Sequence, residues 1–109
     1  MDTITIKERK LPVEANWRAI TAYLKSVGRD SLDAVSDVIS LSPSVIGGLM
    51  AACINEGLRI EGKGERVSAD LLDDLRPVDA VKAANEFVRI YLEQSAPNLP
   101  EEPKKEEAL

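Results

Sequence analysis

Residues 42–68 of the chain read SPSVIGGLMAACINEGLRIEGKGERVS, and this stretch decides the expected fold. Ser42 followed by Pro43 is a strong helix start, because a serine hydroxyl caps free amide groups and a proline at the first helical position gives up a donor that has no partner. We expect this helix to end at Gly57, since glycine is common just after the last helical turn. Its apolar residues fall on one broad face at helical spacing: Val45, Ile46, Leu49, Met50, Cys53 and Ile54.

Two short alternating runs follow this helix, Leu58–Glu61 and Arg66–Ser68. They flank residues 62–65 (GKGE), and short alternating runs around a glycine-bearing turn are typical of a β-hairpin. Within the helix, Gly47 and Gly48 each cost about 1 kcal/mol relative to alanine. We therefore expect another part of the chain to pack closely against them.

The residues before this stretch predict one strand and two helices. Thr3–Lys7 (TITIK) combines β-branched residues with a short alternation, which favours a brief edge strand. Apolar residues recur at helical spacing up to Gly28, which predicts an amphipathic helix with Trp17 in the core; they are Trp17, Ile20, Leu24 and Val27. Asp30 or Ser31 then caps a second helix of about ten residues, with apolar positions at Leu32, Val35, Val38 and Ile39.

The residues after the expected hairpin predict a last helix and a tail. Pro77 interrupts the helical turns expected over Asp70–Leu75. The longer helix that follows has its apolar stripe at Val78, Val81, Ala84, Val88 and Tyr91 or Leu92. From residue 96 onward three prolines and a run of charges leave no apolar period, so we expect one domain over 1–95 and a disordered tail over 96–109.

Composition excludes most enzyme chemistries. The 109 residues hold no His, one Cys, 14 Lys plus Arg and 19 Asp plus Glu. The usual zinc ligands and Ser/His or Cys/His pairs are missing, and Asp70, Asp73 and Asp74 have the spacing of a solvated helix start. We therefore expect no catalytic residues, no metal, no cofactor and no small-molecule substrate. The single Cys53, together with the lack of a signal peptide or membrane span, favours a cytoplasmic protein.

The expected order is a strand, three helices, a hairpin and an appended helix, which is the order of an α+β winged helix-turn-helix domain. Residues 51–61 (AACINEGLRIE) resemble the exit from the third helix into the wing of winged-helix transcription regulators. More loosely, the whole layout and residues 93–99 (EQSAPNL) are similar to the N-terminal domain of MotA-type phage transcription factors. That resemblance implies a phage-type protein that binds a bacterial sigma factor and so acts on host RNA polymerase. The chain has no room for that family's C-terminal DNA-binding domain.

The winged-helix interpretation assigns two sets of DNA-binding residues. Ser42 and Ser44 would open the recognition helix, and Arg59, Lys63 and Arg66 would contact phosphates from the wing. Residues 42–57 contain no Lys or Arg, so the alternative of a core helix beside a solvated hairpin stays open. A further basic set, which the sequence alone cannot place on one surface, comprises Lys7, Arg9, Lys10, Arg18, Lys25 and Arg29.

Phe87, Ile90 and Tyr91 fall partly outside the main stripe of the last helix and are the expected partner-binding residues, in a homodimer or with another protein. The alternative is that they cover the protein's own core. The sequence thus predicts a small non-enzymatic regulator of transcription that binds duplex DNA, the transcription machinery, or both. The second possibility is a protein–protein interaction module without DNA binding, such as a phage-encoded inhibitor or adaptor of RNA polymerase.

Overall fold

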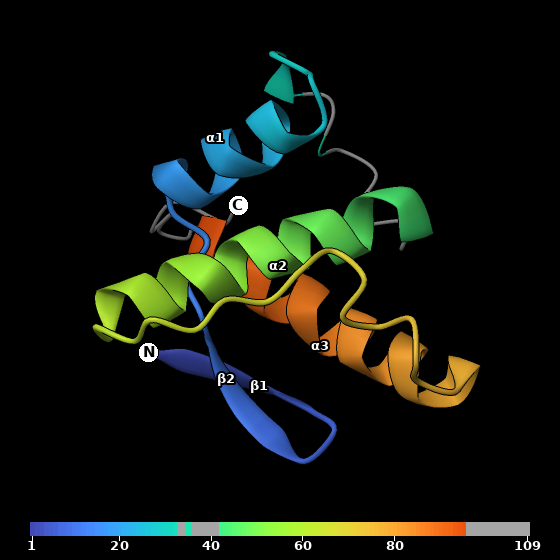
Figure 1. Cartoon of the computed structure of the whole chain (residues 1–109). Coiled ribbons are helices and arrows are strands. Elements are labelled where there is room, and N and C mark those ends of the chain that lie inside the picture. The colour runs from blue at the N-terminus through green and yellow to red at the C-terminus, as the bar shows by residue number, and fades with distance from the viewer. Residues whose placement is uncertain (33–34, 36–41, 96–109) are drawn as a thin grey trace, which may run out of the picture.

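The fold is described from a computed structural model, over residues 1–32, 35 and 42–95. The elements follow the order β1, β2, α1, α2, α3 (Figure 1). Most of the helix expected over residues 30–39 lies outside the described residues, and so does the expected tail over 96–109. The fold class is α+β, but its only described hairpin stands at the start of the chain instead of after the third helix, so the winged-helix order is wrong.

The hairpin pairs β1 (Asp2–Ile6) with β2 (Arg9–Val13) in antiparallel register, with Ile4 opposite Leu11. Lys7 and Glu8 form its two-residue turn with φ angles of 52° and 67°, the left-handed conformation that a type I′ turn needs at both positions. The strand expected over Thr3–Lys7 is confirmed within one residue. The second strand was not predicted, because its turn lacks the usual glycine and it contains Pro12.

Helix α1 (Trp17–Ser26) begins at Asn16, whose side-chain oxygen accepts a hydrogen bond from the Ala19 main-chain N–H at 2.9 Å. Ala19, Tyr23 and Leu24 turn toward the core. Trp17 stands on the first turn with 66% of its surface exposed, so the expectation of a core tryptophan is wrong. The 3.6-residue repeat fixes the angle of a side chain around the helix, but it does not tell whether another element covers the helix at that end.

Helix α2 (Pro43–Ile60) starts where the Ser-Pro pair predicts, but it continues through Gly57 for another turn. Residues 58–60 are therefore helical, not the first strand of a wing. A Cβ atom at residue 57 would lie 2.8 Å from the main-chain carbon and oxygen of Pro12. Gly57 thus serves close packing of α2 against β2 rather than helix termination.

The segment after α2 runs back along the helix instead of pairing with itself (Figure 1). Asn55 holds it: its side chain donates to the Val67 carbonyl at 2.9 Å and accepts from the Val67 N–H at 2.7 Å. A Cβ at residue 47 would lie 2.5 Å from the carbonyl oxygen of Ala69, which confirms the close packing expected at this glycine. Arg66–Ser68 form no strand, so the expected wing is wrong in both halves.

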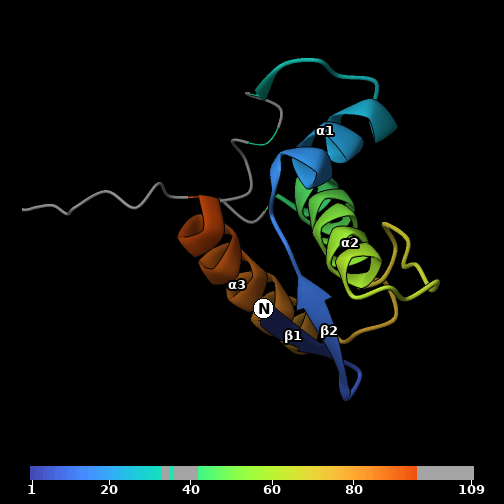
Figure 2. The same cartoon turned by 90° about the vertical axis from the view of Figure 1, so that its left-hand side faces the viewer.

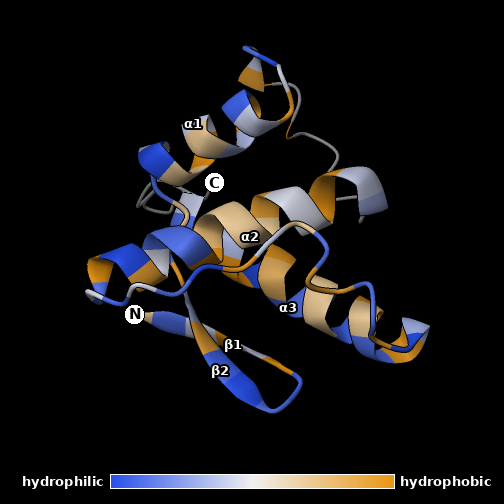
Figure 3. Ribbon diagram, viewed as in Figure 1, coloured by the Kyte–Doolittle hydropathy of each residue, from blue (hydrophilic) through white to orange (hydrophobic). Residues whose placement is uncertain are grey.

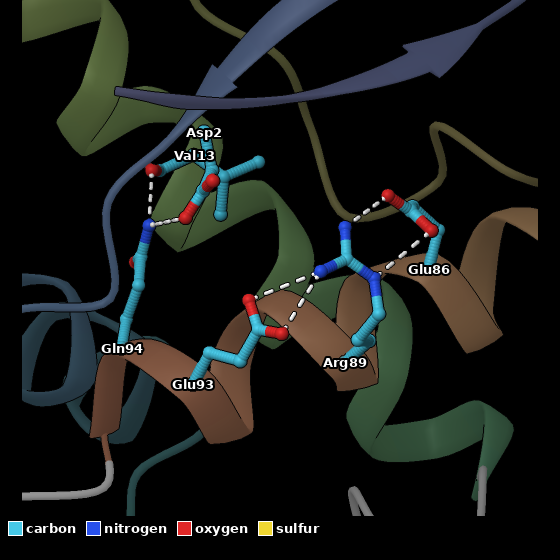
Figure 4. Close-up of polar contacts among 6 residues, drawn as sticks. All are labelled: Asp2, Val13, Glu86, Arg89, Glu93 and Gln94. Atoms are coloured by element: carbon cyan, nitrogen blue, oxygen red, sulfur yellow. Dashed lines mark hydrogen bonds and ion pairs between the residues drawn. The ribbon is translucent and has the colours of Figure 1, made fainter.

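Helix α3 (Pro77–Ser95) completes the core with Ala83, Ala84, Phe87, Ile90 and Tyr91. Near its end, Gln94 fastens the helix to the hairpin: its amide donates to the Val13 carbonyl at 3.0 Å and to Asp2 at 2.9 Å, and its oxygen accepts from the Ala15 N–H at 2.6 Å (Figure 4). Ala84 and Tyr91 of the expected stripe are buried, whereas Val78, Val81 and Leu92 are exposed.

One core joins these elements, with β2 against α2 and β1 against α3. Helix α1 lies on one side of α2, and the hairpin lies on the other (Figures 1 and 2). Apolar residues run along much of α2, whereas the turn of the hairpin is hydrophilic (Figure 3).

Candidate binding site

The expected DNA-binding residues lie at opposite ends of α2. Ser42 and Ser44 stand at its start, Arg59 lies in its last turn, and Lys63 and Arg66 follow in the loop. At 1.5 Å per residue, Ser44 and Arg59 are separated by about 22 Å along the helix axis. The structure therefore does not bring the serines and the basic residues into one surface.

Two of the three basic residues at the end of α2, Arg59 and Lys63, already have carboxylate partners. Arg59 donates from Nε and an Nη atom to Glu56 at 2.9 and 2.8 Å, and the Lys63 ammonium lies 3.4 Å from Glu61. At the other end of α2, the Ser42 and Ser44 hydroxyls hydrogen-bond to each other at 3.1 Å. Nearby carboxylates offset the positive charge that phosphate contact would require.

The further basic set noted in the sequence is divided between two distant parts of the molecule, the hairpin and α1. Lys7 and Arg9 belong to the hairpin turn, and Arg18 and Lys25 belong to α1 on the opposite side of the molecule (Figures 1 and 2). Lys7 pairs with Asp74 at 3.6 Å and Arg9 with Glu65 at 2.6 Å. Two of the three cations of the hairpin cluster are therefore paired locally, Lys10 has no ion pair among the described residues, and the cluster does not extend the basic face of α1.

Phe87, Ile90 and Tyr91 lie in the core of the domain. Phe87 and Ile90 are fully buried, Tyr91 is nearly so, and the two aromatic rings stand 5.9 Å apart. This is the alternative that the sequence left open, in which these residues cover the protein's own core. A homodimer seam through them would require α3 to leave its place, so their position does not support the expected partner-binding role.

Glu56 is the one charged residue with a buried side chain in the described ranges, with 4% of its surface exposed. It accepts hydrogen bonds from Arg59 and from the side-chain amide of Asn16 at 2.7 Å, and Arg18 lies 3.9 Å away. The hydrogen bonds from Arg59 hold the pKa of Glu56 below its usual value, against the opposing effect of burial. A buried carboxylate with three donors around it stays ionised and fixes their positions.

Trp17 is the residue between Asn16 and Arg18 in the chain, on the first turn of α1. We call the group Trp17, Arg18, Glu56 and Arg59 the Trp17 corner. It joins the first turn of α1 to the last turns of α2, and its tryptophan and both guanidinium groups are largely exposed. Sequence analysis missed the corner; the available signals were an Asn16 N-cap next to the single tryptophan and an acid–base pair at Glu56 and Arg59.

The single cysteine, Cys53, is free and buried. Burial, aided by the negative charges of Glu14 and Glu56, raises the pKa of Cys53 to about 12, so its thiol is a packing group rather than a nucleophile. Among the described residues no group of three or more Cys, Asp or Glu side chains is placed to hold a metal ion. Within the same residues, no helix is long and apolar enough to cross a membrane.

No match to this chain was found among protein-family models, curated proteins or solved structures. The function is accordingly inferred from the arrangement of its own residues.

Proposed function

We propose that the protein is a small non-enzymatic regulator that works by binding, and that the Trp17 corner contacts a protein of the transcription machinery such as RNA polymerase. The observation that carries the proposal is the exposure of Trp17 on the first turn of α1, next in the chain to Arg18, which together with Arg59 lies around Glu56. Tryptophan and arginine are the residues most enriched where a few side chains supply most of the energy of a protein interface. An exposed tryptophan also leaves apolar surface in water that a partner can cover.

The corner is held in shape before any partner arrives. Glu56 fixes Arg59 through two hydrogen bonds, and through Asn16 it fixes the first turn of α1, on which Trp17 stands. Side chains that are already ordered lose less conformational entropy on binding than free ones do. The guanidinium groups of Arg18 and Arg59 outnumber the single carboxylate of Glu56, so the corner keeps a positive charge that suits a partner surface with carboxylates.

The role in transcription is carried over from the looser sequence resemblance of residues 93–99 to MotA-type phage transcription factors, because residues 51–60, which resemble an exit into a wing, lie within α2. The structure supplies a hairpin at a different place in the chain, so the part of the winged-helix resemblance that concerned a DNA-binding wing is dropped. Contact with a protein is the part of the expectation that the surface supports best.

Duplex DNA is a second candidate partner, and the observation that favours it is the charge of α1. Residues 15–29 contain Arg18, Lys25 and Arg29 and no Asp or Glu, although the whole chain has a formal charge of −5. Arg18 and Lys25 flank a shallow hollow on the outer face of α1, together with Thr21 and Ser26. These cations could follow a phosphate backbone, which requires no wing.

The test replaces Trp17, the only tryptophan in the chain. Purified bacterial RNA polymerase holoenzyme is titrated against the labelled protein by fluorescence anisotropy, with Trp17→Ala and Trp17→Phe beside the parent. We expect Trp17→Ala to weaken binding at least tenfold, which is about 1.4 kcal/mol. Trp17→Phe should recover part of that loss.

Val78→Ala is the matched control, since Val78 is an equally exposed apolar residue on another helix. If Trp17→Ala leaves holoenzyme binding unchanged, the Trp17 corner is not the contact surface. If the parent does not bind, RNA polymerase is not the partner.

The DNA candidate is tested separately. A mixed pool of duplex DNA is titrated at low and moderate salt with the parent and two double variants, Arg18→Ala/Lys25→Ala and Lys63→Ala/Arg66→Ala. DNA contact through α1 predicts that only the first double variant reduces the salt slope, by about 2.

A further inference from the structure

The two edges of the hairpin differ in what their main-chain groups can do. Ile6 and Arg9 flank the two-residue turn and form a hydrogen-bonded pair, so the alternation of an antiparallel ladder makes Ile4 and Leu11 the next such pair. The N–H and C=O groups of Thr3 and Thr5 therefore point away from β2. On the other strand the outward positions are those of Lys10 and Pro12.

The edge of β2 is closed over its second half, and among the described residues only the outward main-chain groups of Lys10, close to the turn, have no hydrogen bond. Pro12 has no N–H to offer, and its main chain packs against Gly57 of α2. Just beyond the strand, the Glu14 N–H donates to the Cys53 carbonyl at 3.1 Å. Proline and a covering helix are two of the means by which proteins protect a strand edge from pairing.

The edge of β1 is open. The side chains of Thr3 and Thr5 are exposed, and in the described part of the chain no hydrogen bond is formed by their outward main-chain groups. None of the protective features of β2 recurs on the β1 edge: it has no proline or bulge, and no other segment pairs with it. The N–H groups of Thr3 and Thr5 are two hydrogen-bond donors, and their C=O groups are two acceptors, all directed as a further strand would require.

A groove of about 770 Å³ runs beside this edge. It is lined by Ile4 and Ile6 of β1 and by Leu75, and its far wall is one face of α3. The side chains of that wall recur at helical spacing: Asp79, Lys82, Ala83 and Glu86. At 3.4 Å per residue, the five residues of β1 offer about 17 Å of edge, enough for an extended segment of similar length.

The charges of the groove are only partly paired. Lys7 is paired with Asp74, and Glu86 with Arg89 at 2.5 Å (Figure 4). No ion pair is formed by Glu8, Asp79 or Lys82 within residues 1–32, 35 and 42–95. Glu8 lies in the hairpin turn and Asp79 in the first turn of α3, so a cation at that end of a bound segment would find two carboxylates without partners.

We propose that β1 binds an extended segment of a partner protein as a third strand, with small apolar side chains directed toward Ala83 and Leu75 and a lysine or arginine near Glu8 and Asp79. The main-chain groups of Thr3 and Thr5 supply the affinity, and the groove selects the alternate side chains. This site is separate from the Trp17 corner, and it stands whether or not that corner binds RNA polymerase.

A second copy of the chain is a poorer occupant of the same edge. Two β1 strands paired about a twofold axis lie about 4.8 Å apart, whereas two packed helices need 8–10 Å between their axes. Because α3 forms the wall beside the edge, its copy would compete for the same space. A single extended segment adds the strand without adding a helix.

The experiment follows main-chain amides by NMR hydrogen exchange while a capped probe peptide, Lys-Thr-Val-Thr-Val-Thr, is added up to millimolar concentration. Its lysine and valines share one face of the extended strand. In the free protein we expect the Thr3 and Thr5 amides to exchange much faster than those of Ile4 and Ile6, which are paired to β2. With the probe, the Thr3 and Thr5 amides should become protected at least tenfold. Protection absent from both residues, or shifts confined to the Trp17 corner, would overturn the proposal.

Two sets of variants make the test specific. Thr5→Pro removes one outward donor and should weaken the probe about threefold to tenfold, the value of a single hydrogen bond. Lys10→Pro makes the same change at the edge of β2 and should leave probe binding unchanged. If either proline variant unfolds the hairpin, the Asp79→Lys variant tests the proposal instead. The parent should bind the lysine probe more tightly than a matched probe that begins with glutamate, and Asp79→Lys should reverse this preference. An unchanged preference would exclude the charge contact and, with it, the proposed orientation of the segment.

Discussion

The side-chain amide of Asn16 donates a hydrogen bond to Glu56 at 2.7 Å, across 40 residues of sequence, while its oxygen caps α1. One residue therefore starts a helix and ties it to the end of another. Arg59 completes the arrangement from the solvent side. The relative placement of α1 and α2, and with it the position of Trp17, depends on this buried carboxylate.

Replacing Glu56 with alanine should lower the free energy of unfolding by about 2 kcal/mol, since hydrogen bonds to a charged group are worth roughly 1.5–3 kcal/mol each and Arg59 can return to water. Urea unfolding followed by circular dichroism measures the change. The control is Glu93→Ala, which removes an exposed partner of Arg89 and should cost less than about 1 kcal/mol. Equal losses for the two variants would contradict a special role for Glu56.

The same carboxylate should make stability depend on pH in the acid range. Because the folded protein holds the pKa of Glu56 below its unfolded value, the stabilisation is fully present above the unfolded pKa, near 4.5, and is lost as the pH falls through the lower folded pKa. Stability of the parent, measured by urea unfolding between pH 7 and pH 3, should fall more steeply than that of Glu56→Gln. Parallel curves for the two proteins would show that Glu56 titrates normally.

Gly57→Ala should destabilise the protein by about 2 kcal/mol, although alanine is the better helix former, because the added methyl must displace the Pro12 main chain. Gly64→Ala is the control, since a Cβ there meets nothing within 4 Å. Thermal unfolding of both variants gives the comparison. A stabilising Gly57→Ala would mean that α2 and β2 are not in contact at this point.

These residues also show what could be read from the sequence. The start of α2 at Pro43 depends only on local chemistry, so the sequence predicted it correctly. A glycine at residue 57 fits a helix end and a close approach of another main chain equally well. Only the contact with Pro12, 45 residues away, shows that the second interpretation holds. The predicted wing depended on interpreting Gly57 as the end of the helix, and it is wrong because the helix continues to Ile60. The hairpin at Lys7 and Glu8 was missed because both residues adopt positive φ angles, which few side chains favour.

The candidate site was harder to predict than the fold. Arg59 was named from the sequence, but as a phosphate contact of a wing rather than as the partner of a buried glutamate. Trp17 was assigned to the core because it is spaced at helical intervals with Ile20 and Leu24, and no local pattern reveals that α1 leaves its first turn uncovered. Both facts depend on how α1 and α2 pack, which is a property of distant residues.

Cys53 should not react with a thiol reagent such as DTNB while the protein is folded, because burial raises its pKa to about 12 and keeps the reagent out. In urea above the unfolding midpoint the thiol should react at the rate of a free cysteine, and below it the rate should follow the population of open molecules. Absorbance at pH 8 measures this directly. Rapid labelling of the native protein would place Cys53 at the surface.

Replacing Trp17 with alanine should change the free energy of unfolding far less than replacing Phe87. Trp17→Ala should change the free energy of unfolding by less than about 0.5 kcal/mol, as expected for an exposed side chain, whereas Phe87→Ala should cost about 3–5 kcal/mol because it empties a fully buried site. In the parent, the emission maximum of Trp17 should move little on unfolding, since the ring is already in water. A large blue shift in the folded state, together with a costly Trp17→Ala, would return the tryptophan to the core and remove the Trp17 corner as a binding surface.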